Sequence, residues 1–192
     1  MKPVTFIDIE TDPQSAKILD LGAVKVDGTS FHANSIRDFT GFINGSAFLC
    51  GHNILEHDLK YLAPSVDLSG FVFIDTLFLS ALLFPARPYH RLLKDDKLQT
   101  DELNNPLNDA LKARDLFFDE VNRFGQTDAE LKQIFYLLLR DHKAFSGFFK
   151  YTGFSASGGQ AEDLIFKRFK GLLCAHARLE NILRDNPVEL AY

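Results

Sequence analysis

The order of hydrophobic patterns along the 192-residue chain constrains its fold more than any other feature. Before Gly125, short apolar segments typical of β-strands alternate with segments whose apolar residues recur at helical spacing. We expect strands over residues 4–9, 18–26, 30–37, 47–50 and 71–74. We expect one helix that begins at residue 59, a second that ends at residue 83 and a third over residues 107–124. Such alternation predicts an α/β protein with a mixed sheet of about five strands flanked by helices.

After Gly125 the strong patterns are helical. Thr127 and Glu130 have the spacing of a capping box that opens a helix, and helical spacing returns over residues 161–185. We therefore divide the chain into a domain over residues 1–124 and a helical appendage over residues 125–192. Residues 188–192 continue a helix-forming stretch, and we expect the chain to be a part of a longer protein.

The composition, with 46% hydrophobic and 24% charged residues, is typical of a globular protein in water. No apolar run approaches the roughly 18 residues of a membrane span, so we expect no membrane partner. Cys50 and Cys174 lie far apart and lack zinc-ligand spacing, which is typical of reduced cysteines in the cytoplasm. A net charge of −5 argues against a broadly basic surface, although a carboxylate metal site is compatible with it.

Two carboxylates, Asp8 and Glu10, lie in the first apolar segment and are separated by one residue. On a strand, positions two apart face the same side, so both side chains are expected to project together. Their charges repel unless a cation lies between them, and hard oxygen ligands suit Mg²⁺ or Mn²⁺. The alternative interpretation is an acidic turn that follows an edge strand.

Two further acidic motifs follow. His52 and Asn53 precede Asp58, which starts a helix-like run, and Asp109 with Ala110 opens a long amphipathic helix. With Asp8, Glu10 and Thr11, these motifs resemble, in the same order, those of the DEDD family of 3′-5′ exonucleases, which share the ribonuclease H-like fold. The match covers residues 3–122, and residues 18–24 and 75–77 resemble further segments of the family.

The resemblance implies a metal-dependent 3′-5′ exonuclease. Asp8, Glu10, Asp58 and Asp109 would hold two Mg²⁺ or Mn²⁺ ions, which in two-metal hydrolysis lie about 3.5–4 Å apart. Thr11, Asn53 and Asn104 would contact the substrate, for which single-stranded DNA is favoured over RNA. In the competing interpretation, Asp58 and Asp109 are helix caps and nothing more.

The chain departs from the family at the position of the general base. The known branches place a His five residues, or a Tyr four residues, before the last Asp, where this chain has Asn104 and Asn105. An amide does not act as a base near neutral pH. His90 is the nearest replacement and His57 the second candidate; the alternative for His90 is an exposed loop histidine.

A weaker resemblance concerns the context of the chain. Asn104 near Asp109, the helical appendage and the helical end resemble the exonuclease-like region found ahead of RecQ-type DNA helicase modules. The resemblance implies a covalently linked helicase module outside this chain. If catalysis is lost, the same fold would serve instead as a nucleic-acid-binding or helicase-docking module.

Overall fold

The computed structural model describes residues 2–92, 105–156, 158–174, 176 and 178–192. Its strands are β1 (Val4–Thr11), β2 (Ile18–Lys25), β3 (Ser30–Ala33), β4 (Phe48–Gly51) and β5 (Val72–Asp75). The helices up to residue 126 are α1 (Ile36–Ile43), α2 (Asp58–Leu62), α3 (Thr76–Leu83) and α4 (Pro106–Gln126). The later helices are α5 (Ala129–Leu139), α6 (Ser146–Thr152), α7 (Ala161–Arg168), α8 (Leu179–Asp185) and α9 (Pro187–Ala191).

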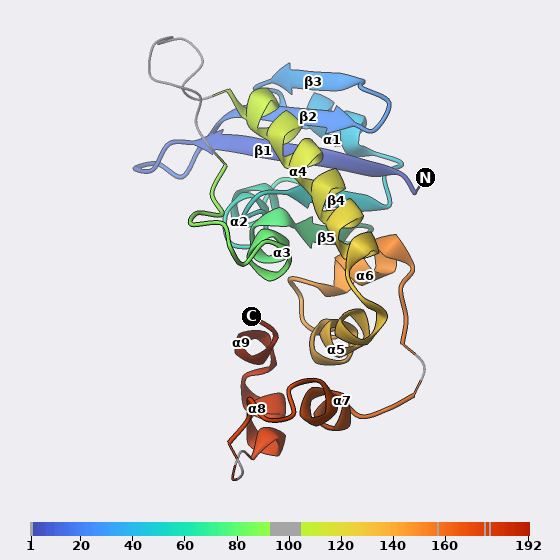
Figure 1. The fold of residues 1–192 in the computed structure, drawn as a ribbon. Helices are drawn as coiled ribbons and strands as arrows, with labels where there is room; N and C mark the ends of the chain where they lie inside the picture. The colour runs from blue at the N-terminus through green and yellow to red at the C-terminus, as the bar shows by residue number, and fades with distance from the viewer. Residues whose placement is uncertain (1, 93–104, 157, 175, 177) are drawn as a thin grey trace.

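The strands form one mixed sheet in the order β3-β2-β1-β4-β5 (Figure 1). β2 pairs antiparallel with β1 and with β3, whereas β4 pairs parallel with β1 and with β5. The predicted fold class is therefore confirmed: an α/β protein with a five-stranded mixed sheet flanked by helices and followed by a helical C-terminal region.

The two faces of the sheet carry different helices. Alternation along β1 sends Val4 and Phe6 into the hydrophobic cluster beneath α4, and Ile7 and Ile9 into the cluster that includes Phe39 of α1. Figure 1 shows α4 crossing the front of the sheet, with α1 behind it. Asp8 and Glu10 continue the series of Val4 and Phe6, so they face the side of the sheet that α4 covers.

The start of α4 touches β2 at Gly22. A Cβ atom built on Gly22 would lie 2.2 Å from the Leu107 backbone nitrogen and 2.2 Å from the Pro106 carbonyl carbon. Only a residue without a side chain permits this approach. Gly22 also pairs with Asp8 in the sheet register, so the first turn of α4 lies close to the acidic part of β1.

Several sequence predictions need correction. Residues 30–37 are not one strand, because β3 ends at Ala33 and Ser35 caps α1 by accepting the amide N–H of Asp38. Thr127 does not open α5; the cap is Asp128, which accepts the N–H of Leu131. The helical pattern over 161–185 is broken after Arg168, so α7 and α8 are separate helices.

The C-terminal helices share the core of the sheet domain. One hydrophobic cluster runs from Phe6 through Phe117 and Phe124 of α4 to Phe148 of α6. Gly147 of α6 lies against β5 so closely that a Cβ there would meet the Phe73 carbonyl oxygen at 1.9 Å. The described part of residues 125–192 is helical, and its division from the sheet domain at residue 124 stays a prediction, since α4 continues to Gln126.

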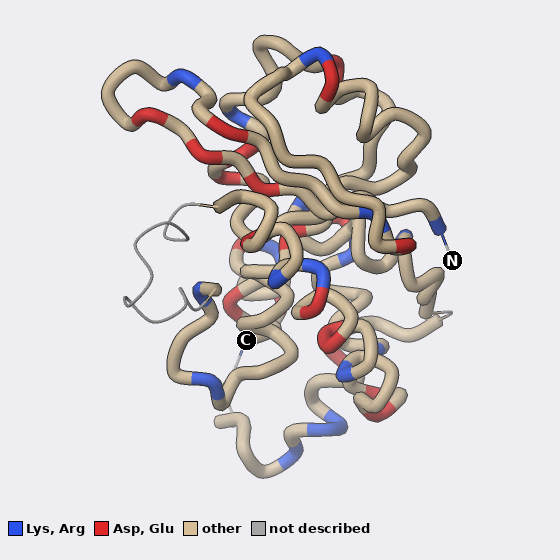
Figure 2. Tube along the Cα trace, turned by 90° about the horizontal axis from the view of Figure 1, so that it is seen from above, with Lys and Arg blue, Asp and Glu red and all other residues tan. Residues whose placement is uncertain are grey.

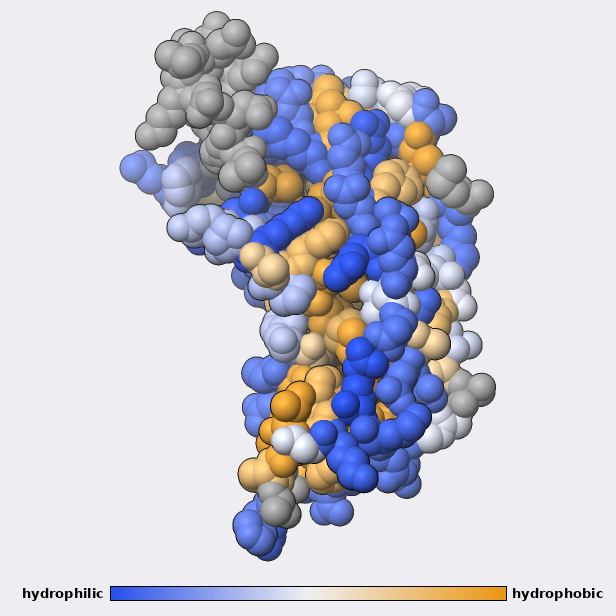
Figure 3. Space-filling view, in the orientation of Figure 1, coloured by the Kyte–Doolittle hydropathy of each residue, from blue (hydrophilic) through white to orange (hydrophobic). Residues whose placement is uncertain are grey.

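Figure 3 shows apolar side chains at the surface of the C-terminal helices. Phe166 of α7 is 39% exposed and Ile182 of α8 is 40% exposed. Among the described residues, no helix combines the length and the hydrophobicity needed to cross a bilayer.

Candidate metal centre

Three acidic side chains converge where β1 meets the start of α4. Asp8, Glu10 and Asp109 each offer a carboxylate oxygen, and these oxygens all lie within 4.8 Å of one another. All three residues are half-buried. We call them the carboxylate group; it brings together three of the four predicted metal ligands.

The shape of β1 places the first two members. Asp8 and Glu10 share the α4 face, and the pairing with β2 shifts register between Glu10 and Thr11. A bulge of this kind bends a strand and changes the direction of the side chains beside it. Figure 2 shows acidic positions gathered along this part of the sheet, where the loop between β1 and β2 projects.

The third member comes from the first turn of α4. Asn105 caps this helix by accepting the N–H groups of Leu107 and Asn108, and Pro106 follows at a position that favours a helix start. Asp109 is therefore not the cap of α4, and its carboxylate is directed to the carboxylate group instead. Lys112, one turn later, places its Nζ 3.6 Å from Asp109 Oδ1.

Asp58, the fourth predicted ligand, is outside the carboxylate group but is attached to the same strand. Its Oδ1 accepts the backbone N–H of Ile9, the residue between Asp8 and Glu10, at 3.0 Å. β4 pairs with β1 only as far as Phe6, so the carboxylate supplies a hydrogen-bond acceptor beyond the end of that pairing. Asp58 is buried, and it is not the cap of α2, since His57 occupies that position.

His57 lies beside these acids. Its Nδ1 is 3.6 Å from Asp58 Oδ2, and the nearby Asp58 carboxylate raises the pKa of His57, with a smaller contribution from Glu10. Burial raises the pKa of Asp58, whereas His57 opposes that shift. His57, the second candidate for the base, therefore lies next to Asp58, the fourth predicted ligand.

The geometry of the carboxylate group fits a hard divalent ion. Mg²⁺ binds oxygen at about 2.0–2.1 Å in an octahedron, so two ligands on opposite sides are about 4.2 Å apart. Three oxygens within 4.8 Å of one another can therefore surround one ion with little movement. Neutralising three adjacent carboxylates would also relieve their mutual repulsion.

The remaining residues of the second motif have structural contacts. Asn53 adopts a left-handed backbone conformation (φ 64°), and its N–H donates to Asp75 Oδ1. Asp75 also accepts the N–H groups of Leu55 and Leu77, so it caps α3 and ties the loop to the start of that helix. Burial, with the nearby His90, lowers the pKa of His52 to about 4. The loop that leads to Asp58 is therefore held to β5 and α3 by hydrogen bonds to Asp75.

His90 is not a member of the carboxylate group. Its Nδ1 is 2.9 Å from Ser80 Oγ of α3, and His90 lines a pocket that also includes Lys112. Thr11, predicted to contact substrate, is half-buried at the end of β1. Asn104 falls outside the described residues.

Sequence reasoning missed two residues of this centre. Gly22 lets α4 approach the sheet, and an isolated glycine inside a strand pattern was the available signal. Lys112 contacts Asp109, and its spacing of three residues on one helix would have predicted that contact.

No family model matches the sequence, and neither the search of curated proteins nor that of solved structures finds a match. The geometry of the site and the resemblance of its motifs are therefore the two indications of function.

Proposed function

We propose that the protein is a metal-dependent hydrolase of phosphodiester bonds that removes nucleotides from the 3′ end of single-stranded nucleic acid, with DNA favoured over RNA. The observation that carries the proposal is the carboxylate group, in which oxygens of Asp8, Glu10 and Asp109 lie within 4.8 Å of one another. Acids from a strand and from a helix about 100 residues later meet there, in the order that the motif resemblance implies.

Asp8, Glu10 and Asp109 would hold Mg²⁺ or Mn²⁺. A bound ion would supply a water of lowered pKa and neutralise charge on the leaving oxygen. The bond from Asp58 to Ile9 fixes the strand between the two β1 ligands. If a second ion binds, Asp58 Oδ2, which is the oxygen not bonded to Ile9, is its natural additional ligand.

Cleavage of single-stranded oligonucleotides labelled at the 5′ end tests the proposal. In Mn²⁺ we expect a ladder that shortens from the 3′ end, and no cleavage by Asp8→Asn or Asp109→Asn. Asp115→Asn is the matched control, since Asp115 lies on the same helix and pairs with Arg114 at the surface. Cleavage by Asp109→Asn at the wild-type rate would contradict the proposal.

A binding or docking module is the second candidate. It is favoured by the apolar surface of the C-terminal helices, where Phe166 and Ile182 are about two-fifths exposed. A RecQ-type helicase module is the partner that the motif resemblance implies. This candidate takes precedence if wild-type protein binds oligonucleotides but releases no nucleotides in Mg²⁺ or Mn²⁺.

A further inference from the structure

A pocket of about 560 Å³ lies between α4 and the segment that follows α3. We call it the cationic pocket, because Arg87, Arg91 and Lys112 line it together with His90, Ser80 and Leu116. None of the described residues that line it is acidic, although the chain as a whole carries a net charge of −5. A cavity of this size accommodates a ligand as large as a nucleotide.

The cationic pocket adjoins the carboxylate group through Lys112. This side chain lines the pocket and also places Nζ 3.6 Å from Asp109 Oδ1. A ligand in the pocket therefore lies beside the candidate metal centre. A nucleic-acid chain that has one phosphodiester at the carboxylate group can therefore place a neighbouring phosphate in the pocket.

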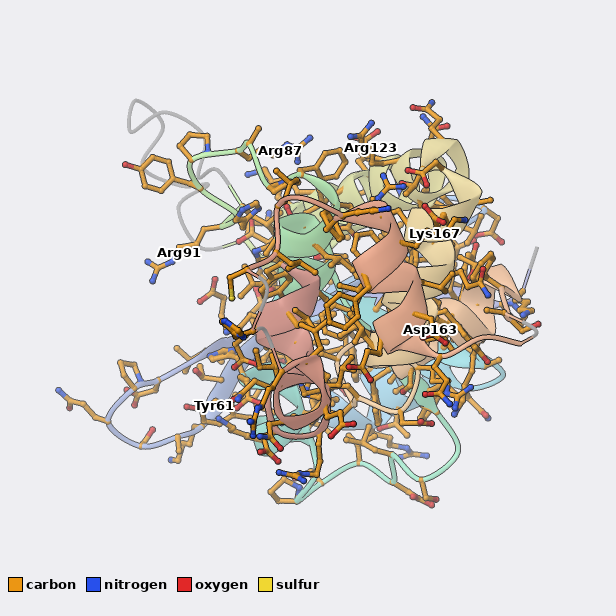
Figure 4. All side chains as sticks on the ribbon, turned by 60° about the horizontal axis from the view of Figure 1, so that its bottom comes forward. Tyr61, Arg87, Arg91, Arg123, Asp163 and Lys167 are labelled. Atoms are coloured by element: carbon orange, nitrogen blue, oxygen red, sulfur yellow. The ribbon has the colours of Figure 1, made fainter. Side chains whose placement is uncertain are left out.

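Two lining side chains are held in place before any ligand binds. The Arg87 guanidinium lies 3.8 Å from the centroid of the Phe84 ring, and His90 Nδ1 is 2.9 Å from Ser80 Oγ. Such preorganisation reduces the conformational entropy that binding would otherwise cost. Figure 4 shows Arg87 and Arg91 on the segment after α3, with the Arg91 side chain extending outward.

An exposed aromatic ring completes the pocket. Tyr89 lines it and is 78% exposed, although large apolar rings are normally covered. Cations that contact phosphates, combined with an aromatic ring on which a base stacks, are typical of proteins that bind single strands. A paired base cannot stack on the ring in this way unless it first leaves the duplex.

We propose that the cationic pocket binds a nucleotide of single-stranded nucleic acid next to the one that is cleaved, with Arg91 and Lys112 at its phosphate and Tyr89 against its base. The inference rests on the proposed function for the position of the cleaved bond. Binding by the pocket does not itself require hydrolysis, so the two can be tested separately.

Fluorescence anisotropy with a labelled 12-nucleotide oligothymidylate, in the presence of a chelator, measures binding without metal or cleavage. We expect Arg91→Ala to weaken binding about tenfold, as for loss of a charge-assisted hydrogen bond, and to reduce the slope of log K against log [NaCl] by about 1. Tyr89→Ala should weaken binding by a similar factor through loss of stacking. Arg37→Ala, an exposed cation of α1 on the opposite face of the sheet, is the matched control.

The outcomes separate the two proposals. If Arg91→Ala binds oligothymidylate as tightly as Arg37→Ala does, the pocket proposal is overturned. Equal competition by poly-glutamate and by oligothymidylate would also overturn it and point to an acidic polypeptide. Thymidine 5′-(p-nitrophenyl phosphate) is a small phosphodiester that contains one nucleotide. If wild-type protein fails to hydrolyse it in Mn²⁺ while the binding results hold, the proposed hydrolase function fails and the pocket remains a nucleic-acid site.

Discussion

Gly22 of β2 and Leu107 of α4 approach each other backbone to backbone, so that a Cβ on Gly22 would lie 2.2 Å from the Leu107 nitrogen. Gly22 pairs with Asp8, and Asp109 follows Leu107 by half a turn. The distance between the two polypeptide backbones therefore determines whether Asp8 and Asp109 can share an ion.

Replacing Gly22 with Ala should disrupt both the fold and the centre. The new methyl group would push α4 from the sheet, at a cost of about 1–3 kcal/mol or more in the free energy of unfolding. We expect a lower melting temperature and a smaller stabilisation by Mg²⁺. Gly41→Ala is the control: nothing lies within 4 Å of its Cβ position in α1, and alanine there should stabilise the helix by roughly 0.5–1 kcal/mol. Equal Mg²⁺ responses in both variants would show that Gly22 does not position Asp109.

Metal binding should stabilise the folded protein. We expect Mg²⁺ and Mn²⁺ to raise the melting temperature relative to chelator, because an ion that binds only the native state adds RT ln(1 + [L]/Kd) to its stability. Asp109→Asn should lose most of this response, and Asp115→Asn should keep it. Identical melting of wild-type protein in Mg²⁺ and in chelator would refute a metal site at the carboxylate group.

Two substitutions of Asp58 separate anchoring from metal binding. Asp58→Ala leaves the buried Ile9 N–H without an acceptor, which should cost about 1–3 kcal/mol in stability. Asp58→Asn keeps a carbonyl oxygen for that bond, so most of the stability should remain. We expect Asp58→Asn to retain the Mg²⁺ response in thermal melting. A loss as complete as that of Asp109→Asn would make Asp58 a principal ligand.

Glu120 of α4 should make stability depend on pH. Its buried carboxylate oxygens make no hydrogen bond among the described residues, and burial raises the pKa of Glu120 well above its ordinary value of 4.5. Asp75 and Asp119 reinforce the shift and Arg87 opposes it, while Cys50 also lies near. Above pH 4.5 the unfolded carboxyl loses its proton while the folded one keeps it, so the free energy of unfolding falls as pH rises.

Removing the Glu120 charge should remove that dependence. We expect the melting temperature of Glu120→Gln, relative to wild type, to increase steadily between pH 5 and pH 8. Glu180→Gln, at an exposed site in α8, should show no such trend. A difference between Glu120→Gln and wild type that stays constant with pH would mean that Glu120 is ionised in the folded protein.

The identity of the base can be tested at two histidines. If the protein cleaves oligonucleotides, we expect His90→Ala to lower the rate by about 10²-fold or more, with the Mg²⁺ response unchanged. His57→Ala tests the alternative, since Asp58 and Glu10 both act on the His57 ring. Asn104→His should raise activity if His90 is a poor substitute. Full activity in both alanine variants would mean that metal-bound water attacks without a histidine base.

The sequence predicted the parts of the fold whose patterns are local. The strands predicted from the apolar runs of residues 4–9 and 18–26 are present as β1 and β2. α1 was missed, although Ser35 and Asp38 have the spacing of a helix start, because the alternation of Phe31 and Ala33 with polar residues suggested a longer strand. The break between α7 and α8 was missed because helical periodicity alone does not mark where a helix is interrupted.

The types and the order of the acidic residues predicted which carboxylates lie together, but not the backbone contacts around them. Motif order placed Asp8, Glu10 and Asp109 together, and the structure does so. The bond from Asp58 to Ile9 could not be predicted, since it depends on where the pairing of β4 with β1 ends. Side-chain orientation near such an end follows from three-dimensional packing, which sequence spacing does not encode.

The contact at Gly22 lies at the start of α4, so a tilt of this helix would pivot near Pro106. Asp109 lies about 4–5 Å along the helix axis from Pro106, whereas Gln126 lies about 30 Å away, at 1.5 Å per residue. A tilt of about 5° about this pivot would move Gln126 by roughly 2.6 Å but Asp109 by only about 0.4 Å. A tilt of the distal part of α4 would thus be strongly attenuated before it reaches the carboxylate of Asp109.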